Sequence, residues 1–214
     1  MSRLGFALAI GMATFTAALP ASAQQLGTKG DMVFGVERIF GIRAERMDLE
    51  RPDPPGDLER SGTTLSLGLA RTLVPYNIPR ATFDYFIADH WNIGGALGYS
   101  NSDADDDPGG SLSVSDFVFA PRGGYLHMFG SVAGIWPRAG FTYHSTSFED
   151  TYSEWTMALT LECQFPLVIR QHFGVLLGVA FDQSLLGNRN PEDDPDEDID
   201  YRSIGVQVAL FGWI

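Results

Sequence analysis

The feature that most constrains the fold is a strict two-residue alternation of large apolar side chains with small or polar ones. In residues 152–165 one face carries Trp155, Met157, Leu159, Leu161, Cys163 and Phe165. Alternation with a period of two places successive side chains on opposite faces of a β-strand. The pattern recurs in seven other segments: 62–71, 80–88, 92–100, 113–126, 132–146, 173–185 and 201–214. The sequence therefore predicts an all-β chain.

The composition of the two faces distinguishes a soluble protein from a membrane protein. A soluble barrel or sandwich turns its apolar face inward, so its outer face should be rich in Lys, Glu and Thr. Here the face opposite the apolar one consists mostly of Gly, Ala, Ser and Thr with scattered charges. Small residues suit a narrow lumen, and large apolar ones suit lipid. We predict an antiparallel up-and-down transmembrane β-barrel; the alternative is a secreted soluble β-barrel that binds a small apolar ligand.

Connection lengths support the barrel and set its orientation. Short connections at 88–91, 127–131 and 166–172 alternate with the connections at 101–112, 147–151 and 187–200, of which the first and the last are clearly longer. Outer-membrane barrels have short periplasmic turns and longer loops outside. Eight alternating segments follow Gly62, and residues 31–42 resemble a ninth. Both chain ends lie in the periplasm only if the strand number is even, so we predict eight strands. Ten is the alternative, if residues 31–50 fold back as two strands, and the role of residues 31–60 is left open.

The first 23 residues have the organisation of a secretory signal peptide. Arg3 supplies a positive charge, residues 4–13 are apolar, and Ala21 and Ala23 form an A-x-A cleavage site. We predict cleavage after Ala23, which divides the chain into a signal peptide at 1–23 and one barrel domain at 24–214.

The acidic balance of the chain restricts its partners. The formal net charge is −13, with aspartates and glutamates concentrated at 103–107 and 192–200. Such a charge excludes nucleic acid as an expected partner. The first stretch has the alternate aspartates of a calcium loop, but Val114 stands where such a loop has its glutamate. We expect loose association of divalent cations at these loops rather than a specific metal site, and no cofactor.

Charged residues on the small-residue face are the first candidates for a site. Inside a narrow lumen they should pair with one another, because an unpaired buried charge is costly. These lumen charges are Asp84, Asp116, Arg122, Arg138, Glu154, Glu162 and Asp182. Near the expected strand ends lie four tryptophans that would form an aromatic girdle at the membrane interfaces. They are Trp91, Trp136, Trp155 and Trp213.

One group of residues has the composition of a hydrolase site. His144 is followed by Ser145, Ser147, Glu149 and Asp150 near an expected outer rim. A serine hydrolase needs its histidine within hydrogen-bonding reach of the nucleophile, but adjacent strand residues such as His144 and Ser145 face opposite sides. A membrane-embedded lipid hydrolase is therefore an alternative, and we expect no catalysis.

Three segments resemble the OmpA-like outer-membrane β-barrel superfamily: the hairpin at 83–99, the strand at 120–125 and the C-terminal strand at 204–214. The last resembles the signal read by the outer-membrane assembly machinery, although Trp213 is penultimate and Ile214 is last. The resemblance implies a bacterial outer-membrane location, with outer-membrane lipid and that machinery as partners. It implies no activity. We therefore expect a structural, surface-interaction or limited-permeation role.

Overall fold

The computed structural model describes residues 26–51, 56–67, 78–106, 110–148, 152–191 and 197–214. No helix within these ranges is long and apolar enough to cross a membrane. The strands in chain order are β1 (Met32–Arg51), β2 (Gly56–Leu67), β3 (Arg80–Ala88), β4 (Trp91–Asp106), β5 (Gly110–Tyr125), β6 (His127–Phe129), β7 (Ala133–Phe148), β8 (Tyr152–Arg170), β9 (Phe173–Pro191) and β10 (Glu197–Trp213).

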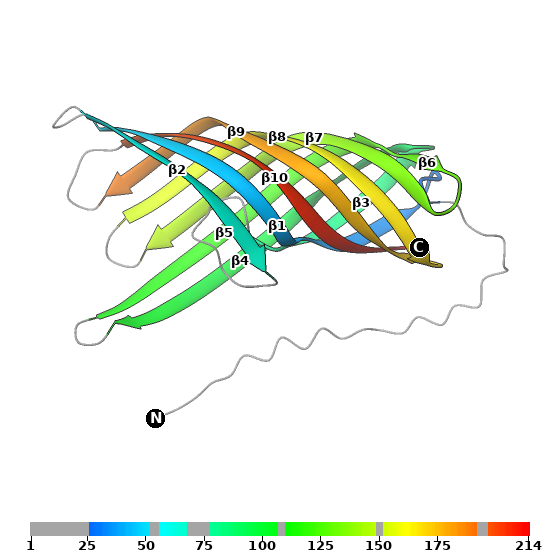
Figure 1. Cartoon of the computed structure of the whole chain (residues 1–214), viewed down its shortest axis with the longest axis horizontal. Helices are drawn as coiled ribbons and strands as arrows, with labels where there is room; N and C mark the ends of the chain where they lie inside the picture. Colours follow the sequence, from blue (N-terminus) through cyan, green and yellow to red (C-terminus); the bar gives the residue numbers. More distant parts are fainter. Residues whose placement is uncertain (1–25, 52–55, 68–77, 107–109, 149–151, 192–196) are drawn as a thin grey trace, which may run out of the picture.

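The strands close into one antiparallel ring. The order around it is β1, β3, β4, β5, β7, β8, β9 and β10, and β10 pairs back onto β1. Figure 1 shows these strands running obliquely around a common axis, with the C-terminus at the same end as β6. Each of these eight strands pairs with a neighbour on both sides, as the strands of a closed membrane-spanning sheet do. The predicted eight-stranded antiparallel barrel is confirmed.

The ten described strands occupy only eight positions around the ring, because β2 and β6 each share a position with another strand. One edge of β1 pairs with β3 over residues 32–37 and with β2 over residues 40–51. In the same way β6 follows β5 along one edge of β7. The alternative of ten strands is wrong, because residues 32–51 form a single strand and do not fold back. The predicted strand at 62–71 is present in part, as β2, and residues 68–71 lie outside the described ranges.

The strands are longer at the outer end than the apolar alternation predicts. β4 and β5 continue pairing up to Asp106 and Gly110, and β9 continues to Pro191. Figure 1 shows the β4–β5 hairpin standing clear of the neighbouring strands at that end. Backbone pairing does not need apolar side chains, so it continues beyond the segment that faces lipid. The alternation therefore marks the lipid-facing part of each strand and not the strand's end.

The wall is apolar outside and polar inside. Along β3 buried residues alternate with exposed ones. The exposed set consists of large apolar side chains around the whole ring, among them Phe83, Leu97, Phe117, Phe141, Leu161, Val179 and Ile204. The buried set includes arginines, aspartates, glutamates and threonines. This distribution is the reverse of that in a soluble barrel and is the one that a lipid-facing surface requires.

The periplasmic end of the barrel is filled by an apolar cluster. It contains Leu26, Val33, Phe86, Leu126, Met128, Trp136, Leu176, Ala209, Phe211 and Trp213. Trp136 is fully buried and Trp213 is 4% exposed, so their predicted place in a lipid-facing girdle is wrong. Both side chains point inward, where Trp136 donates a hydrogen bond to the Asn92 side chain at 2.9 Å.

A short N-terminal segment fastens Leu26 into this cluster. The Asp31 carboxylate accepts hydrogen bonds from the backbone N–H groups of Gly27 and Thr28, each at 2.9 Å. The segment is tied to the β3–β4 turn by Gly30 N–H to Phe86 O and by His90 N–H to Gly27 O. We call residues 26–31 the periplasmic strap. It holds Leu26, 3% exposed, in the mouth of the barrel.

Candidate functional site

The candidate site is a layer of buried charges in the middle of the lumen. In the described part of the chain it brings together five arginines and four carboxylates. They are Arg38, Arg43, Arg80, Arg122, Arg138, Glu37, Asp84, Glu162 and Asp182. We refer to these nine residues as the charge layer. Five of the seven predicted lumen charges belong to it: Asp84, Arg122, Arg138, Glu162 and Asp182.

A β-bulge in β1 supplies two of these charges. The register of β1 against β10 shifts between Val36 and Phe40, and Arg38 has a positive φ of 57°. A bulge inserts an extra residue and redirects the side chains next to it. As a result the consecutive residues Glu37 and Arg38 are both buried, at 2% and 1% exposure. Regular alternation would have turned one of them toward lipid.

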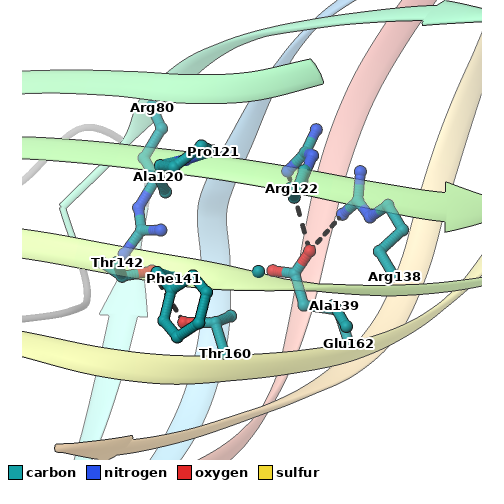
Figure 2. Close-up of a pocket in the computed structure, with 11 residues that line it drawn as sticks. Arg80, Ala120, Pro121, Arg122, Arg138, Ala139, Phe141, Thr142, Thr160 and Glu162 are labelled. Carbon is teal, nitrogen blue, oxygen red and sulfur yellow. Dashed lines mark hydrogen bonds and ion pairs between the residues drawn. The ribbon is translucent and has the colours of Figure 1, made fainter. Parts of the chain in front are cut away.

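One half of the layer is centred on Glu37. Its carboxylate accepts hydrogen bonds from Arg122 at 2.7 and 3.0 Å and from Arg138 at 2.7 Å. Arg122 also donates to Asp84 at 2.6 Å. Glu162 forms ion pairs with Arg138 at 2.7 Å and with Arg122 at 3.7 Å, and Figure 2 shows both guanidinium groups directed at this carboxylate. Arg122 and Arg138 each bridge carboxylates from different strands, so these contacts cross the lumen.

The other half of the layer is centred on Asp182. Arg38 donates to both of its carboxylate oxygens, at 3.3 Å each, and Arg43 donates to one of them. The hydroxyl groups of Thr160 and Ser203 donate to it at 2.7 and 3.2 Å. A fully buried carboxylate is stable only when its oxygens are paired and hydrogen-bonded in this way. Asp182 therefore ties β1 to β8, β9 and β10.

The layer packs closely because small residues face it. A Cβ atom on Gly124 would lie 2.8 Å from Arg138 Cγ and 2.8 Å from Asn92 Oδ1. Separations that short do not occur between real atoms of this kind, so any side chain at this position would displace Arg138. The glycines on the inner face thus make room for arginines on the neighbouring strands.

A small void beside the layer shows how little space remains. The hydrogen-bond ladder between β5 and β7 is interrupted between Phe119 and Arg122, because Pro121 has no N–H group. The void lies inside this interruption, next to Arg80, Arg122 and Thr142, and Figure 2 shows these side chains around it. Its volume of about 10 Å³ is at the lower limit for one water molecule. The void is too small to be a binding site for an organic ligand.

Two predicted lumen charges lie nearer the outer end. Asp116 accepts a hydrogen bond from the Thr146 hydroxyl at 2.7 Å, and Glu154 accepts one from Arg189 at 2.9 Å. Both carboxylates are buried inside the barrel, at 6% and 8% exposure. They are separate from the charge layer and line the lumen above it.

The described residues of the hydrolase alternative do not form a triad. His144 is buried inside the barrel, and its Nε2 atom lies 3.1 Å from Thr146 Oγ1 and 3.5 Å from Asp116 Oδ1. In a triad the acid and the nucleophile bind opposite nitrogens of the imidazole ring. Here hydroxyl and carboxylate both approach Nε2. Ser145 and Ser147 alternate with His144 along β7, so they lie on the opposite face of the strand and face outward. Glu149 and Asp150 lie outside the described residues.

The remaining two girdle tryptophans face outward. Trp91 is 56% exposed and packs against Tyr125 at the periplasmic end, with ring centroids 5.0 Å apart. Trp155 stacks on Tyr143 towards the outer end, at 6.4 Å. These two pairs mark the two edges of the lipid-facing surface.

Sequence reasoning missed Glu37, Arg38, Arg43 and Arg80. The first two follow from the bulge, for which the sequence has no signal, and Arg43 lies in a segment whose role was left open. Arg80 has the same parity as Asp84 on β3, so the alternation was sufficient to find it. The predicted signal peptide with Ala21 and Ala23 lies outside the described residues. The side chains of 103–107 and 192–196 also do, and within the described part no three metal-binding side chains form a group that could hold a metal ion.

No family model matches the chain, and no curated protein matches its sequence. Solved structures that match include the outer membrane protein OprG from Pseudomonas aeruginosa, at 13% identity over 86% of this chain and 96% of that chain, with a TM-score of 0.48. Neisserial surface protein A matches at 9% identity over 84% and 96%, with a TM-score of 0.44. The outer membrane protease OmpT from Escherichia coli matches at 7% identity over 90% and 100%, with a TM-score of 0.45. The closed ring of strands and its inverted side-chain distribution make the fold that of an outer-membrane β-barrel.

Proposed function

We propose that this protein is a closed, non-conducting barrel of the bacterial outer membrane that carries extended strands at the cell surface and catalyses no reaction. The observation that carries the proposal is the charge layer, which fills the lumen with side chains that bind one another. Outer-membrane lipid and the outer-membrane assembly machinery are its proposed partners. Loose divalent cations at the acidic outer segments are a further proposal, and nucleic acid is not among the proposed partners.

Two successive barriers support the absence of a pore. An ion entering from the outside meets the charge layer, whose ion pairs would have to separate to let it pass. Breaking one buried pair costs about 3–5 kcal/mol, because a charge is left without its partner. Below the layer an ion meets the apolar cluster around Trp136, which offers it no hydrogen bonds. The two barriers act in series, so opening one of them does not open the lumen.

The outer extensions support a role in surface interaction. Tyr99 is the last large apolar side chain that faces outward on β4, and the strand continues for seven more residues to Asp106. At about 3.3 Å per residue these residues extend about 23 Å beyond the lipid-facing segment. Exposed segments held on a rigid scaffold are where binding functions concentrate. We infer that the barrel is the anchor and that this hairpin meets the partner.

The test is ion conductance across planar lipid bilayers. The refolded chain should insert without producing conductance steps, because the charge layer and the apolar cluster both close the lumen. A large-pore porin added to the same bilayers is the positive control for detection. Regular conductance steps from the unmodified chain would contradict a closed barrel and would favour the limited-permeation role.

A further inference from the structure

One edge of β4 has no described strand beside it over its outer half. β4 pairs with β3 only up to Leu97, which lies opposite Ala81, but it pairs with β5 as far as Asp106. Above β3, the neighbouring place along β1 is taken by β2, and within the described residues β2 pairs with β1 alone. Residues 99–106 of β4 therefore present a row of backbone N–H and C=O groups that no described strand binds. We call this row the free edge of β4.

The sequence itself ends the pairing at this level. β3 begins at Arg80, and the residue before it is Pro79, which has no N–H group to donate to β4. A Cβ atom on Gly98 would lie 3.1 Å from Pro79 O, so the start of β3 lies directly against β4 here. Just above, Tyr99 is the most exposed large hydrophobic side chain of the described residues, at 68%. This exposure is what the absence of a cross-strand neighbour on one side produces.

We propose that an extended, basic segment of a partner protein at the cell surface adds to the free edge of β4 as a further strand. The inference rests on the proposed role of the β4–β5 hairpin in surface interaction and names how the partner binds there. A strand edge offers donors and acceptors in alternation, and an extended peptide satisfies both along its whole length. The free edge is longer than the about 5–6 residues of a typical strand, so one peptide strand fits along it.

The charge of the hairpin selects a basic segment. Residues 103–107 contain four aspartates, and residues 98–121 contain no lysine or arginine. Opposite charges on neighbouring strands stabilise their pairing, whereas like charges directly opposite each other destabilise it. Lysine and arginine are therefore favoured in the part of the added strand that lies beside the aspartates. At the inner end the exposed ring of Tyr99 favours an apolar residue.

Two other strand edges at the outer end are poorer sites for such a segment. The opposite edge of the hairpin is open only over residues 110–113, because β5 pairs with β7 from Val114 onward. The edge of β2 is longer, but residues 56–67 combine two acidic residues with Arg60. Neither of these edges combines free length with a single sign of charge, as β4 does.

A second copy of the chain is a poor occupant of the free edge. Its β4 would bring the same aspartates against the first set, and like charges on facing strands repel. Two barrels in one membrane also have the same orientation, so their β4 strands run in the same direction and cannot pair antiparallel. Charges on exposed edges are a common means by which sheets avoid pairing with themselves. The aspartates that oppose a second copy attract a basic segment.

The experiment uses the full chain, refolded in detergent micelles, and a synthetic peptide in which lysine alternates with valine or threonine. Heat-modifiable gel mobility first establishes that each variant has folded as a barrel. Fluorescence anisotropy of the labelled peptide measures binding, and amide hydrogen exchange followed by NMR shows which strand the peptide covers. In the chain alone every second amide between Tyr99 and Asp106 should exchange rapidly, because those amides lie on the free edge. The peptide should slow the exchange of the same amides.

The matched variants remove equal charge from two different strands. Asp103→Asn/Asp105→Asn, on β4, should weaken peptide binding several-fold. Asp57→Asn/Glu59→Gln, on β2, should leave binding unchanged. A peptide of the same sequence that is N-methylated at its amides keeps every charge but cannot donate backbone hydrogen bonds, so it should bind several-fold more weakly.

Equal binding of the N-methylated and unmodified peptides would show attraction between charges alone and would overturn the addition of a strand. Slow exchange of all amides between Tyr99 and Asp106 in the chain alone would show that the edge is already paired, and would also overturn it. Loss of binding in the β2 variant and not in the β4 variant would overturn the choice of edge. A barrel that conducts ions would contradict the closed lumen of the proposed function and leave the peptide result standing.

Discussion

At the residue scale the decisive property is that each carboxylate of the inner layer is paired with at least one arginine from another strand. Asp182 is the clearest case, because two arginines and two hydroxyl groups converge on one carboxylate with no exposure to solvent. Burying such a group is costly, and the cost is offset only while all partners are present. The layer therefore depends on each of its members more strongly than a surface network would.

Asp182→Asn should lower the free energy of unfolding by about 3 kcal/mol, because Arg38 and Arg43 would lose their shared counter-charge. The measurement is urea unfolding in lipid vesicles, followed by tryptophan fluorescence. Arg46→Gln is the matched control: it breaks the exposed pair with Asp48, which should contribute no more than about 1 kcal/mol. Equal effects of the two substitutions would mean that the layer is not buried as described.

The prediction of single residues from the sequence succeeded where it used the odd or even position of a residue in its strand, which decides the face on which the side chain lies. It failed where it did not use that position. Asp84 and Arg138 were found because they share the polar face of their strands. Trp136 and Trp213 were misplaced because their nearness to a strand end was given more weight than their parity. Trp136 has the parity of Arg138 on β7, and both are buried. The alternation alone therefore contained the correct answer for Trp136.

At the element scale the periplasmic strap is the segment that closes one mouth of the barrel. Its hydrogen bonds to the β3–β4 turn hold Leu26 among Phe86, Leu126 and Trp136. The strap comes before the first strand and contributes nothing to the ring of strands. Its contribution is to close the mouth of the barrel.

Leu26→Asp should open the periplasmic mouth, because a carboxylate is not stable within the apolar cluster. The readout is labelling of a cysteine at Met128→Cys by a water-soluble maleimide, with Cys163→Ser removing the native thiol. Met128 is 7% exposed, so labelling should be slow in the parental background and about tenfold faster with Leu26→Asp. Lys29→Ala, in the exposed part of the strap, is the control and should change nothing. Unchanged labelling with Leu26→Asp would show that the strap does not seal the mouth.

Elements were predictable to the extent that lipid imposes a pattern on them. The segments 80–88 and 92–100 were predicted with nearly their observed starts, because their outward faces lie in the lipid-facing belt. The continuation of β4 and β5 beyond the belt was not predicted, since water imposes no alternation on paired strands. The bulge in β1 was not predicted either, because it depends on the partners of Glu37 and Arg38 across the lumen.

At the scale of the whole molecule the fold follows from a side-chain distribution that is the reverse of the one in a soluble barrel. Large apolar residues cover the outside of a closed ring, and charges that pair with one another fill the inside. The sequence contained the first half of this description in its alternation and part of the second half in its inward charges. It did not contain the apolar cluster at the periplasmic end, which assembles from residues of the strap and several different strands.

The central claim, a barrel folded in the outer membrane, is tested most directly by membrane fractionation combined with gel mobility before and after boiling. The chain should be recovered with the outer membrane, and unheated samples should migrate differently from boiled ones, because a closed barrel resists detergent until heated. Recovery as a soluble periplasmic protein, with no shift on boiling, would contradict the account.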